Sequence, residues 1–233
     1  MIKYGIDVSQ WQGDIDWNVV KTDFAILRAG YGKIASQMDV KFERNYKGAK
    51  AAGIPVGAYW YSYAKSANEA REEAKVFMQF LKGKQFEYPV YFDVEESSTL
   101  SLGRDKVSDI IIAFLDEMEK NGYFAGLYMS ASPLAQFTTQ YIKDRYAIWV
   151  AHYGVDKTTY TGQYGMWQKS STGKVDGIKG NVDLNECYVD YPFCIKKDGR
   201  NGFEKVVEKP PETLTGTLKL SNGDTYKVTL TKE

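Results

Sequence analysis

Apolar residues recur along this chain in short runs, separated by longer stretches in which they repeat at helical spacing. Short runs rich in β-branched and aromatic residues, bounded by Gly, Pro, Asn or Asp, predict strands. Strands that alternate with helices favour a parallel sheet, and eight such strands are typical of a β/α barrel. The predicted strands cover residues 3–8, 24–29, 56–61, 89–94, 124–129, 147–151, 165–168 and 181–184.

The stretches between these strands carry helix signals of their own. Ser66 and Glu69 form a capping box, and Gly83 stands where the helix would end. Between residues 107 and 118 the apolar side chains repeat at spacings of three and four, which places them on one helix face. These patterns predict helices that cover the outside of the barrel.

The character of the sequence changes near Lys196. Residues 196–213 are charged and rich in turn formers, which indicates a linker. Beyond it, apolar residues alternate on both sides of Asn222-Gly223, a strong hairpin signal. A lone hairpin is marginal in water, so we expect it to pack on the barrel, on residues 203–207 or on another chain. The fold prediction is an α/β protein: an irregular TIM-like (β/α) barrel over residues 1–195, a linker, and a short C-terminal β-hairpin extension over residues 214–233.

Charge and hydropathy exclude two classes of partner. Thirty basic residues balance thirty acidic ones, whereas nucleic-acid binders usually carry a basic excess. No apolar run approaches the ~18–20 residues that span a bilayer. We therefore expect neither a nucleic-acid nor a membrane partner. The N-terminus shows no apolar signal region, so we expect either a removed signal or release by phage lysis.

Cysteine and histidine are scarce. The two cysteines, Cys187 and Cys194, are too few for a disulfide scaffold, and their spacing leaves open whether they pair or stay reduced. The single histidine, His152, fits a buried or rim residue better than a metal ligand. Because no spacing matches a zinc or calcium site, we expect neither metal nor cofactor.

Acidic residues mark the ends of three predicted strands. Asp93 and Glu95 are two apart at the end of one strand, so they project to the same face. Asp7 ends the first strand and Asp183 the last, and in a parallel barrel these ends meet at one rim. Like charges ~6–7 Å apart favour protonation of one partner, and a proton donor beside an anion is what glycoside hydrolysis requires. Taken singly, each acid is more typical of a turn, a helix cap or a solvated loop than of a catalytic site.

Aromatic residues gather near the same strand ends. Tyr59 and Tyr61 share one face of the third predicted strand, and Tyr128 and Trp167 lie near the ends of others. Aromatic rings pack against the C–H faces of sugars, which makes these four candidates for substrate binding, with core packing as the alternative. Arg28, on the second predicted strand, either pairs with a rim acid or forms a surface ion pair.

A series of sequence motifs, which occur in a fixed order, resembles the motifs of a known family. The segments are YGIDVSQWQGDIDW, FAILRAGYG, AAGIPVGAYWY, YPVYFDVEE, AGLYMS, MWQ and NVDLN. Over residues 2–191 they resemble the glycoside hydrolase family 25 lysozymes, which are N-acetylmuramidases. The resemblance implies a flattened barrel that cleaves the β-1,4 bond between N-acetylmuramic acid and N-acetylglucosamine in peptidoglycan. It also implies that Glu95 is the general acid, that Asp93 is its charged partner, and that Asp7 and Asp183 line the same cleft.

Two other functions remain as alternatives. One is a chitinase-like hydrolase of N-acetylglucosamine polymers, and the other is a barrel that binds glycan without cleaving it. The full set of acids argues against the second, because a lectin needs no buried acid pair. The partner we expect is the glycan strand of bacterial peptidoglycan, met outside the cell by a monomer, with self-association through the tail as the alternative state.

Overall fold

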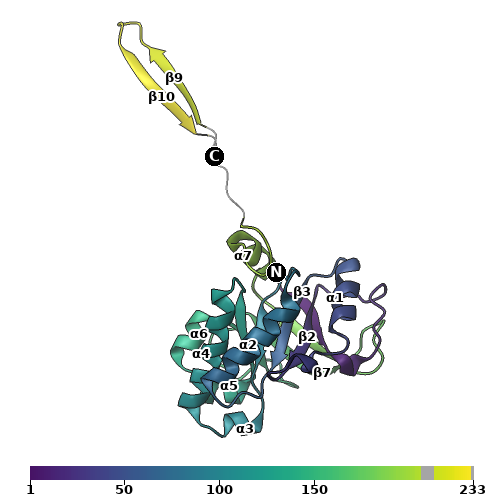
Figure 1. The fold of residues 1–233 in the computed structure, drawn as a ribbon. Helices are drawn as coiled ribbons and strands as arrows, with labels where there is room; N and C mark the ends of the chain where they lie inside the picture. The colour runs from purple at the N-terminus through teal and green to yellow at the C-terminus, as the bar shows by residue number, and fades with distance from the viewer. Residues whose placement is uncertain (206–212, 232–233) are drawn as a thin grey trace.

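The computed structural model describes residues 1–205 and 213–231, and its main body is a closed barrel of eight strands (Figure 1). Each strand pairs with its neighbours in sequence, and the last closes onto the first. The predicted barrel is confirmed, and every predicted strand overlaps an observed one. The strands are β1 (Lys3–Val8), β2 (Phe24–Tyr31), β3 (Val56–Tyr61), β4 (Val90–Asp93), β5 (Ala125–Ser130), β6 (Ala147–Ala151), β7 (Met166–Gly173) and β8 (Val182–Cys187).

The direction of β8 departs from the prediction. Strands β1 to β7 run parallel, but β8 is antiparallel to both β7 and β1. Only residues 174–181 join β7 to β8, which is too few for the crossover that a parallel pair needs. The prediction that Asp183 ends its strand was therefore wrong: Asp183 is the second residue of β8. The reversal still places it at the C-terminal rim of β1, opposite Asp7.

The barrel is irregular because helices follow only some of its strands. The helices occupy the connections between β2 and β6, and Ser66 caps α2 by accepting a hydrogen bond from the Glu69 amide at 3.2 Å. Only this half of the predicted capping box is formed, because the Glu69 carboxylate accepts the Lys65 amide at 2.8 Å instead of the Ser66 amide. Residues 152–165 and 174–181, which the structure describes throughout, contain no helix. The outer helices are α1 (Phe42–Ala51), α2 (Ala67–Leu81), α3 (Ser97–Leu100), α4 (Arg104–Lys120), α5 (Ala131–Phe137) and α6 (Gln140–Arg145).

Two apolar layers sit on opposite faces of the strands. Side chains on the outward face pack against the helices, as where Phe92 stacks on Phe114 with ring centroids 3.8 Å apart. Side chains on the inward face fill the barrel, as where Tyr91 packs on Trp149 at 5.1 Å. Successive residues of a strand alternate between these layers. The predicted alternation in β4 is thereby confirmed, and Asp93 shares the inward face of Tyr91.

Helix α7 (Tyr191–Asp198) and the turn after it close the opposite end of the barrel, where the sequence predicted a linker from Lys196. Asn201 is fully buried there, with a left-handed φ of 55°. Its Nδ2 donates to the carbonyls of Phe86 and Tyr88, and its Oδ1 accepts from the amide of Phe124. One side chain thus satisfies the backbone at the starts of β4 and β5, which explains why the packed chain extends past residue 196.

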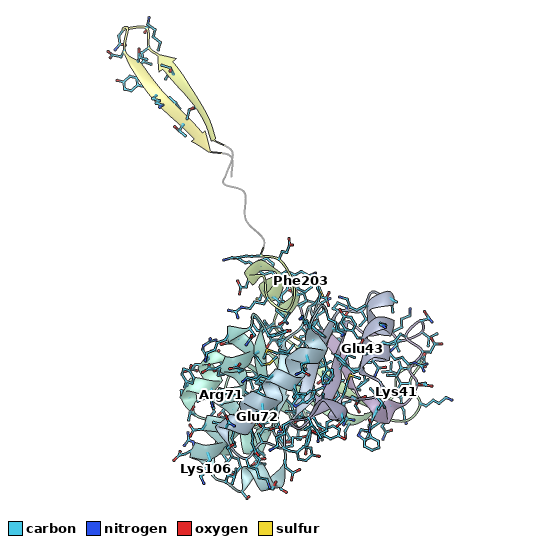
Figure 2. The ribbon with its side chains drawn as sticks, viewed as in Figure 1. Lys41, Glu43, Arg71, Glu72, Lys106 and Phe203 are labelled. Carbon is cyan, nitrogen blue, oxygen red and sulfur yellow. The ribbon has the colours of Figure 1, made fainter. Side chains whose placement is uncertain are left out.

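The structure also shows the state of the two cysteines. Cys187 in β8 and Cys194 in α7 are both free thiols, so the disulfide alternative is not realised. The Cys187 thiol donates to the Val189 carbonyl at 3.3 Å. Phe203 lies beside α7 (Figure 2), and the ammonium group of Lys196 stands 5.3 Å from its ring centroid.

The predicted hairpin is present as β9 (Thr213–Lys219) and β10 (Thr225–Thr231). Its register sets Leu218 opposite Tyr226 and Gly216 opposite Val228, so the apolar positions of both strands share one face. Leu218 and Tyr226 are each 53% exposed, which means that neither is covered by the barrel. Residues 206–212, the later part of the predicted linker, lie outside the described residues.

Asn201→Ala should destabilise the barrel by about 2–4 kcal/mol, because it leaves two buried carbonyls and one buried amide without partners. Denaturant unfolding monitored by tryptophan fluorescence measures this directly. Asn18→Ala, at an exposed asparagine, is the matched control and should change the free energy of unfolding by less than about 0.5 kcal/mol. Equal stability of the two variants would contradict the role assigned to Asn201.

Candidate active site

Four carboxyl groups meet at the C-terminal rim of the parallel strands. Asp7 near the end of β1 lies opposite Asp183 near the start of β8, Asp93 ends β4, and Glu95 follows two residues later. Asp7 and Asp93 are each only 4% exposed, Asp183 is half-buried and Glu95 is exposed. The charge of another member raises the pKa of Asp7, Asp93 and Glu95, and Asp183 shares a hydrogen bond with Asp7. The structure therefore brings together all four acids that the sequence singled out.

The two deepest acids favour their neutral forms. Burial raises the pKa of Asp7 well above its usual range, and the charge of Asp183 raises it further, while hydrogen bonds from Asn185 and Gln168 lower it. Burial likewise raises the pKa of Asp93, as do the charges of Glu95 and Asp7, against the opposing charge of Arg28. The Oδ1 atom of Asp93 is buried and has no hydrogen-bond partner among the described residues.

The two shallower acids sit closer to solvent. Burial raises the pKa of Asp183 to about 6, and its hydrogen bond with Asp7 acts in the opposite direction. The Glu95 residue is exposed, but protein atoms surround its carboxyl group on one side. That partial desolvation raises the pKa of Glu95, the charge of Asp183 raises it further, and a hydrogen bond from Ser130 lowers it. A carboxylic acid that holds its proton beside an anion is suited to proton donation.

Arg28 has a partner that the sequence did not indicate. Its Nε donates to Oδ2 of Asp39 at 2.7 Å, and Asp39 is fully buried. The same Asp39 oxygen accepts the backbone amide of Gln10 at 2.9 Å, which ties β2 to the loop after β1. Arg28 therefore pairs with neither a rim acid nor a surface acid, although its charge lowers the pKa of Asp93.

Three of the four aromatic candidates lie with the acids. Tyr59 is half-buried and meets the ring of Trp149 edge-on at 6.2 Å. The charges of Asp7 and Asp93 act on its phenol, and those of Asp93 and Glu95 on the phenol of Tyr61. Tyr128 is buried, and its hydroxyl lies where Glu95 and Asp93 both act on it.

Trp167 lies elsewhere. It belongs to the apolar layer outside the barrel, and its indole N–H donates to the carbonyl of His152 at 3.0 Å. The reason is strand alternation: Gln168, the next residue of β7, points inward and contacts Asp7, so Trp167 must point outward. The sequence places both residues near a strand end but does not fix which one faces the acids.

Three residues of this region were not predicted from the sequence. Gln168 and Asn185 are buried amides that hydrogen-bond Asp7, and Tyr153 donates to Gln168 at 2.5 Å. Only the register between β7 and β8, which sets Gln168 opposite Asn185, brings the two amides together.

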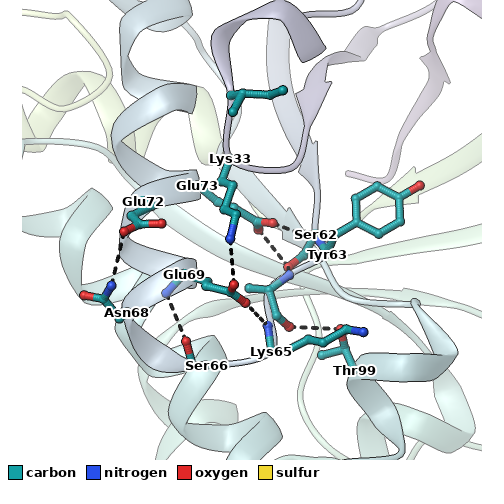
Figure 3. A network of polar contacts seen from close by, with 12 residues as sticks. Lys33, Ser62, Tyr63, Lys65, Ser66, Asn68, Glu69, Glu72, Glu73 and Thr99 are labelled. Atoms are coloured by element: carbon teal, nitrogen blue, oxygen red, sulfur yellow. Dashed lines mark hydrogen bonds and ion pairs between the residues drawn. The ribbon is translucent and has the colours of Figure 1, made fainter.

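A buried acid outside the group anchors the loop after β3 (Figure 3). Glu73 of α2 accepts the Ser62 hydroxyl at 2.8 Å through one carboxylate oxygen and the Tyr63 amide at 2.9 Å through the other. The exposed ring of Tyr63 packs on Tyr61 at 5.2 Å. Glu73 therefore fixes the backbone that follows two tyrosines of the rim. Burial raises the pKa of Glu73 to about 7.

Two further observations on the described residues concern metal ligands and membrane-spanning helices. Within 1–205 and 213–231, no three His, Cys, Asp or Glu side chains are grouped to hold a metal ion. In the same ranges, no helix combines the length and apolar character needed to cross a bilayer.

Comparison with known proteins identifies the family. The family model described as glycosyl hydrolases family 25 matches residues 6–178, most of the barrel. The chain belongs to glycosyl hydrolase family 25. This family 25 chain is 31% identical over 185 residues to the autolytic lysozyme of Clostridium acetobutylicum, covering 78% of this chain and 55% of that protein.

Solved structures of family 25 chains share the barrel. The bacterial lysozyme of Streptomyces coelicolor superposes with a TM-score of 0.72 at 28% identity, covering 80% of this chain and 92% of the other. The modular autolysin LytC from Streptococcus pneumoniae, solved with a synthetic peptidoglycan ligand, superposes with a TM-score of 0.71 at 29% identity, covering 80% and 47%. This family 25 chain is a glycoside hydrolase.

Glu73 should make stability depend on pH. Its pKa is higher in the folded protein than the usual 4.5, so the native state binds more protons than the unfolded chain between pH 4.5 and about 7. The contribution of Glu73 to the free energy of unfolding is therefore complete below pH 4.5 and falls as pH rises through 7, by about 3 kcal/mol at most.

Thermal unfolding across this pH range tests the assignment with Glu73→Gln, which keeps a hydrogen-bonding side chain but cannot ionise. The variant should lose much less stability than the wild type between pH 4.5 and 7. Glu72→Gln, at the exposed neighbour on the same helix, should follow the wild-type curve. Parallel curves for all three proteins would disprove the role of Glu73.

Proposed function

We propose that this glycoside hydrolase is a lysozyme that cleaves the β-1,4 bond between N-acetylmuramic acid and N-acetylglucosamine in bacterial peptidoglycan. The observation that carries the proposal is the group of four acids at one rim, in which Glu95 holds its proton more firmly than a free glutamic acid and Asp183 provides a nearby negative charge. Family membership supports it, as does the peptidoglycan ligand of the related autolysin LytC.

Glu95 is the general acid in this proposal. It stands at the exposed edge of the group, where a glycosidic oxygen of a long polymer has access. Its raised pKa keeps the carboxylic acid protonated closer to neutral pH, which general acid catalysis of glycoside cleavage requires. As the leaving group departs with this proton, the resulting carboxylate is available to activate water in the second step.

Asp93 is the partner that stabilises positive charge. Its buried Oδ1 lacks a hydrogen-bond partner among the described residues, which leaves an acceptor free for a group of the substrate. The sugar at the scissile bond carries a 2-acetamido group whose carbonyl oxygen can attack its own anomeric carbon. Asp93 would accept the N–H of that amide, and the positive charge that develops there would favour the ionised form of Asp93, which burial by itself disfavours. This is the substrate-assisted form of retaining hydrolysis.

The remaining rim residues bind the glycan. Tyr59, Tyr61 and Tyr128 lie among the acids, so they are the aromatic residues we assign to the site, with Arg28 held beside them by Asp39. Trp167 is left out, because it faces the outer layer. The catalytic unit in this proposal is the barrel through residue 205, and it works outside the cell, where peptidoglycan lies.

Glu95→Gln should lower the rate of wall lysis by about 10²–10⁴-fold, because the amide keeps the shape of the side chain but cannot donate the proton. Turbidity loss of purified bacterial walls measures the rate, and unfolding curves confirm that the variant folds. Glu96→Gln is the control, since the adjacent acid caps α3 and lies outside the group. A folded Glu95→Gln protein with near-normal lysis would remove Glu95 from this role. Cleavage of soluble chitin oligomers without wall lysis would instead support a chitinase-like enzyme.

The reaction should proceed with net retention at the anomeric carbon. Attack by the substrate acetamido group and then by water inverts the centre twice, so the first product released is the β-anomer. Proton NMR of the fresh reducing end, recorded before mutarotation, distinguishes the anomers. An α-anomer appearing first would show that an acid activates water for direct displacement.

A further inference from the structure

Two buried amide side chains converge on one oxygen of Asp7. The Nε2 atom of Gln168 in β7 and the Nδ2 atom of Asn185 in β8 each donate to Oδ2 of Asp7 at 2.8 Å. Both amides are almost completely buried and lie opposite each other in the β7–β8 register. One carboxyl oxygen of Asp7 thus receives two N–H groups, while neither amide donates to the other oxygen.

Neighbouring donors fix the orientation of both amides. The indole N–H of Trp149, which can only donate, binds Oδ1 of Asn185 at 2.8 Å. The hydroxyls of Tyr128 and Tyr153 bind Oε1 of Gln168 at 2.7 and 2.5 Å. Because each amide oxygen is taken by these donors, each NH₂ group is turned toward Asp7.

This arrangement decides where Asp7 can carry a proton. With Oδ2 occupied by two N–H donors, a proton on Asp7 belongs on Oδ1, and Asp7 and Asp183 are joined by a hydrogen bond between their side chains. Asp183 faces Asp7 from β8, the charge of Asp7 acts on Asp93 of β4, and the phenols of Tyr59 and Tyr153 lie within reach of the same charge. The cation of this region, Arg28, lowers the pKa of Asp93 and is not among the groups that shift Asp7.

We propose that Gln168 and Asn185 are positioning residues that occupy Oδ2 of the buried Asp7 and so direct its proton from Oδ1 to Asp183, where the hydrogen bond stabilises the negative charge beside Glu95. Their function is to set the proton position in the Asp7–Asp183 pair, not to contact substrate. The last link, from Asp183 to proton donation by Glu95, rests on the proposed function, whereas the proton position itself does not.

Burial keeps the proton on Asp7, because it outweighs the amide hydrogen bonds, which by themselves lower the pKa of Asp7. The amides therefore select the oxygen that carries the proton, and the hydrogen bond from Asp7 lowers the pKa of Asp183 against the effect of burial. The charge that remains on Asp183 then raises the pKa of Glu95. Substitution of Gln168 or Asn185 should therefore change the pKa of Glu95 through the intervening carboxyl groups of Asp7 and Asp183.

Carbon-13 NMR of side-chain carboxyls in aspartate-labelled protein tests the proton position without any need for activity. Asp7→Asn and Asp183→Asn variants assign the two signals. In the wild type, Asp183 should titrate at about pH 6, with Asp7 still protonated there. Gln168→Met removes one N–H donor at nearly constant volume, opens Oδ2 to the proton and weakens the hydrogen bond to Asp183. The Asp183 midpoint should then rise by about one unit.

Asn185→Leu provides an independent second variant if the first fails to fold, and it should move the Asp183 midpoint in the same direction. Gln163→Met, at an exposed glutamine near the start of β7, is the matched control and should leave every midpoint unchanged. Folded Gln168→Met and Asn185→Leu proteins with a wild-type Asp183 midpoint would overturn the proposal and reduce the amides to packing.

Kinetics on walls or soluble fragments test the link to catalysis. Gln168→Met should lower kcat by about tenfold or more with little change in KM, and should shift the pH profile, because the loss acts through Glu95 and not through binding. A rise in KM alone would show that the amide contacts substrate and would contradict the proposal. Loss of activity in Glu95→Gln bears on the proposed function, while the carboxyl titrations stand or fall separately.

Discussion

The cost of placing several carboxyl groups close together in one low-dielectric barrel end governs this structure. Asp7 and Asp93 are almost fully buried, and no cation among the described residues forms an ion pair with either: Arg28, whose charge acts on Asp93, is bound to Asp39. Burial and mutual repulsion therefore act together, and both favour protonation. Of the two acids nearest solvent, Asp183 and Glu95, Asp183 is the one whose charge raises the pKa of the other. This gradient from neutral acids in the interior to an anion and a proton donor at the edge is the arrangement on which the proposed role of the rim in glycoside cleavage rests.

The barrel meets this cost with polar neighbours drawn from distant strands. β7 supplies Gln168 and β8 supplies Asn185, and the antiparallel direction of β8 brings Asp183 to the rim as well. A parallel eighth strand would present its other end there. The irregularity of the barrel is thus tied directly to the composition of the acid group. A polar neighbour from a distant element also acts after β3, where the Glu73 carboxylate accepts the backbone amide of Tyr63.

Stability and function are separated along the molecule. At the opposite end of the barrel, Asn201 and α7 satisfy the starts of β4 and β5, with no ionisable group in that set of hydrogen bonds. The outer apolar layer, with stacked rings such as Phe92 and Phe114, holds the strands rigidly from behind. Rigid strands allow the acids to be kept in an electrostatically unfavourable arrangement, because the neighbouring packing compensates for it.

The sequence by itself determined the local features. Period-two and helical patterns located the eight strands, the Ser66 cap and the hairpin turn at Asn222-Gly223, since each depends on neighbouring residues alone. Ordered motifs also indicated the family and the four acids. Tertiary structure decided the direction of β8, the burial of Asn201 beyond the predicted boundary, and the outward face of Trp167 in contrast to Gln168. Strand direction and facing follow from which strands pair, and contacts such as Asn185 to Asp7 join residues that are far apart in sequence, so no local pattern records them.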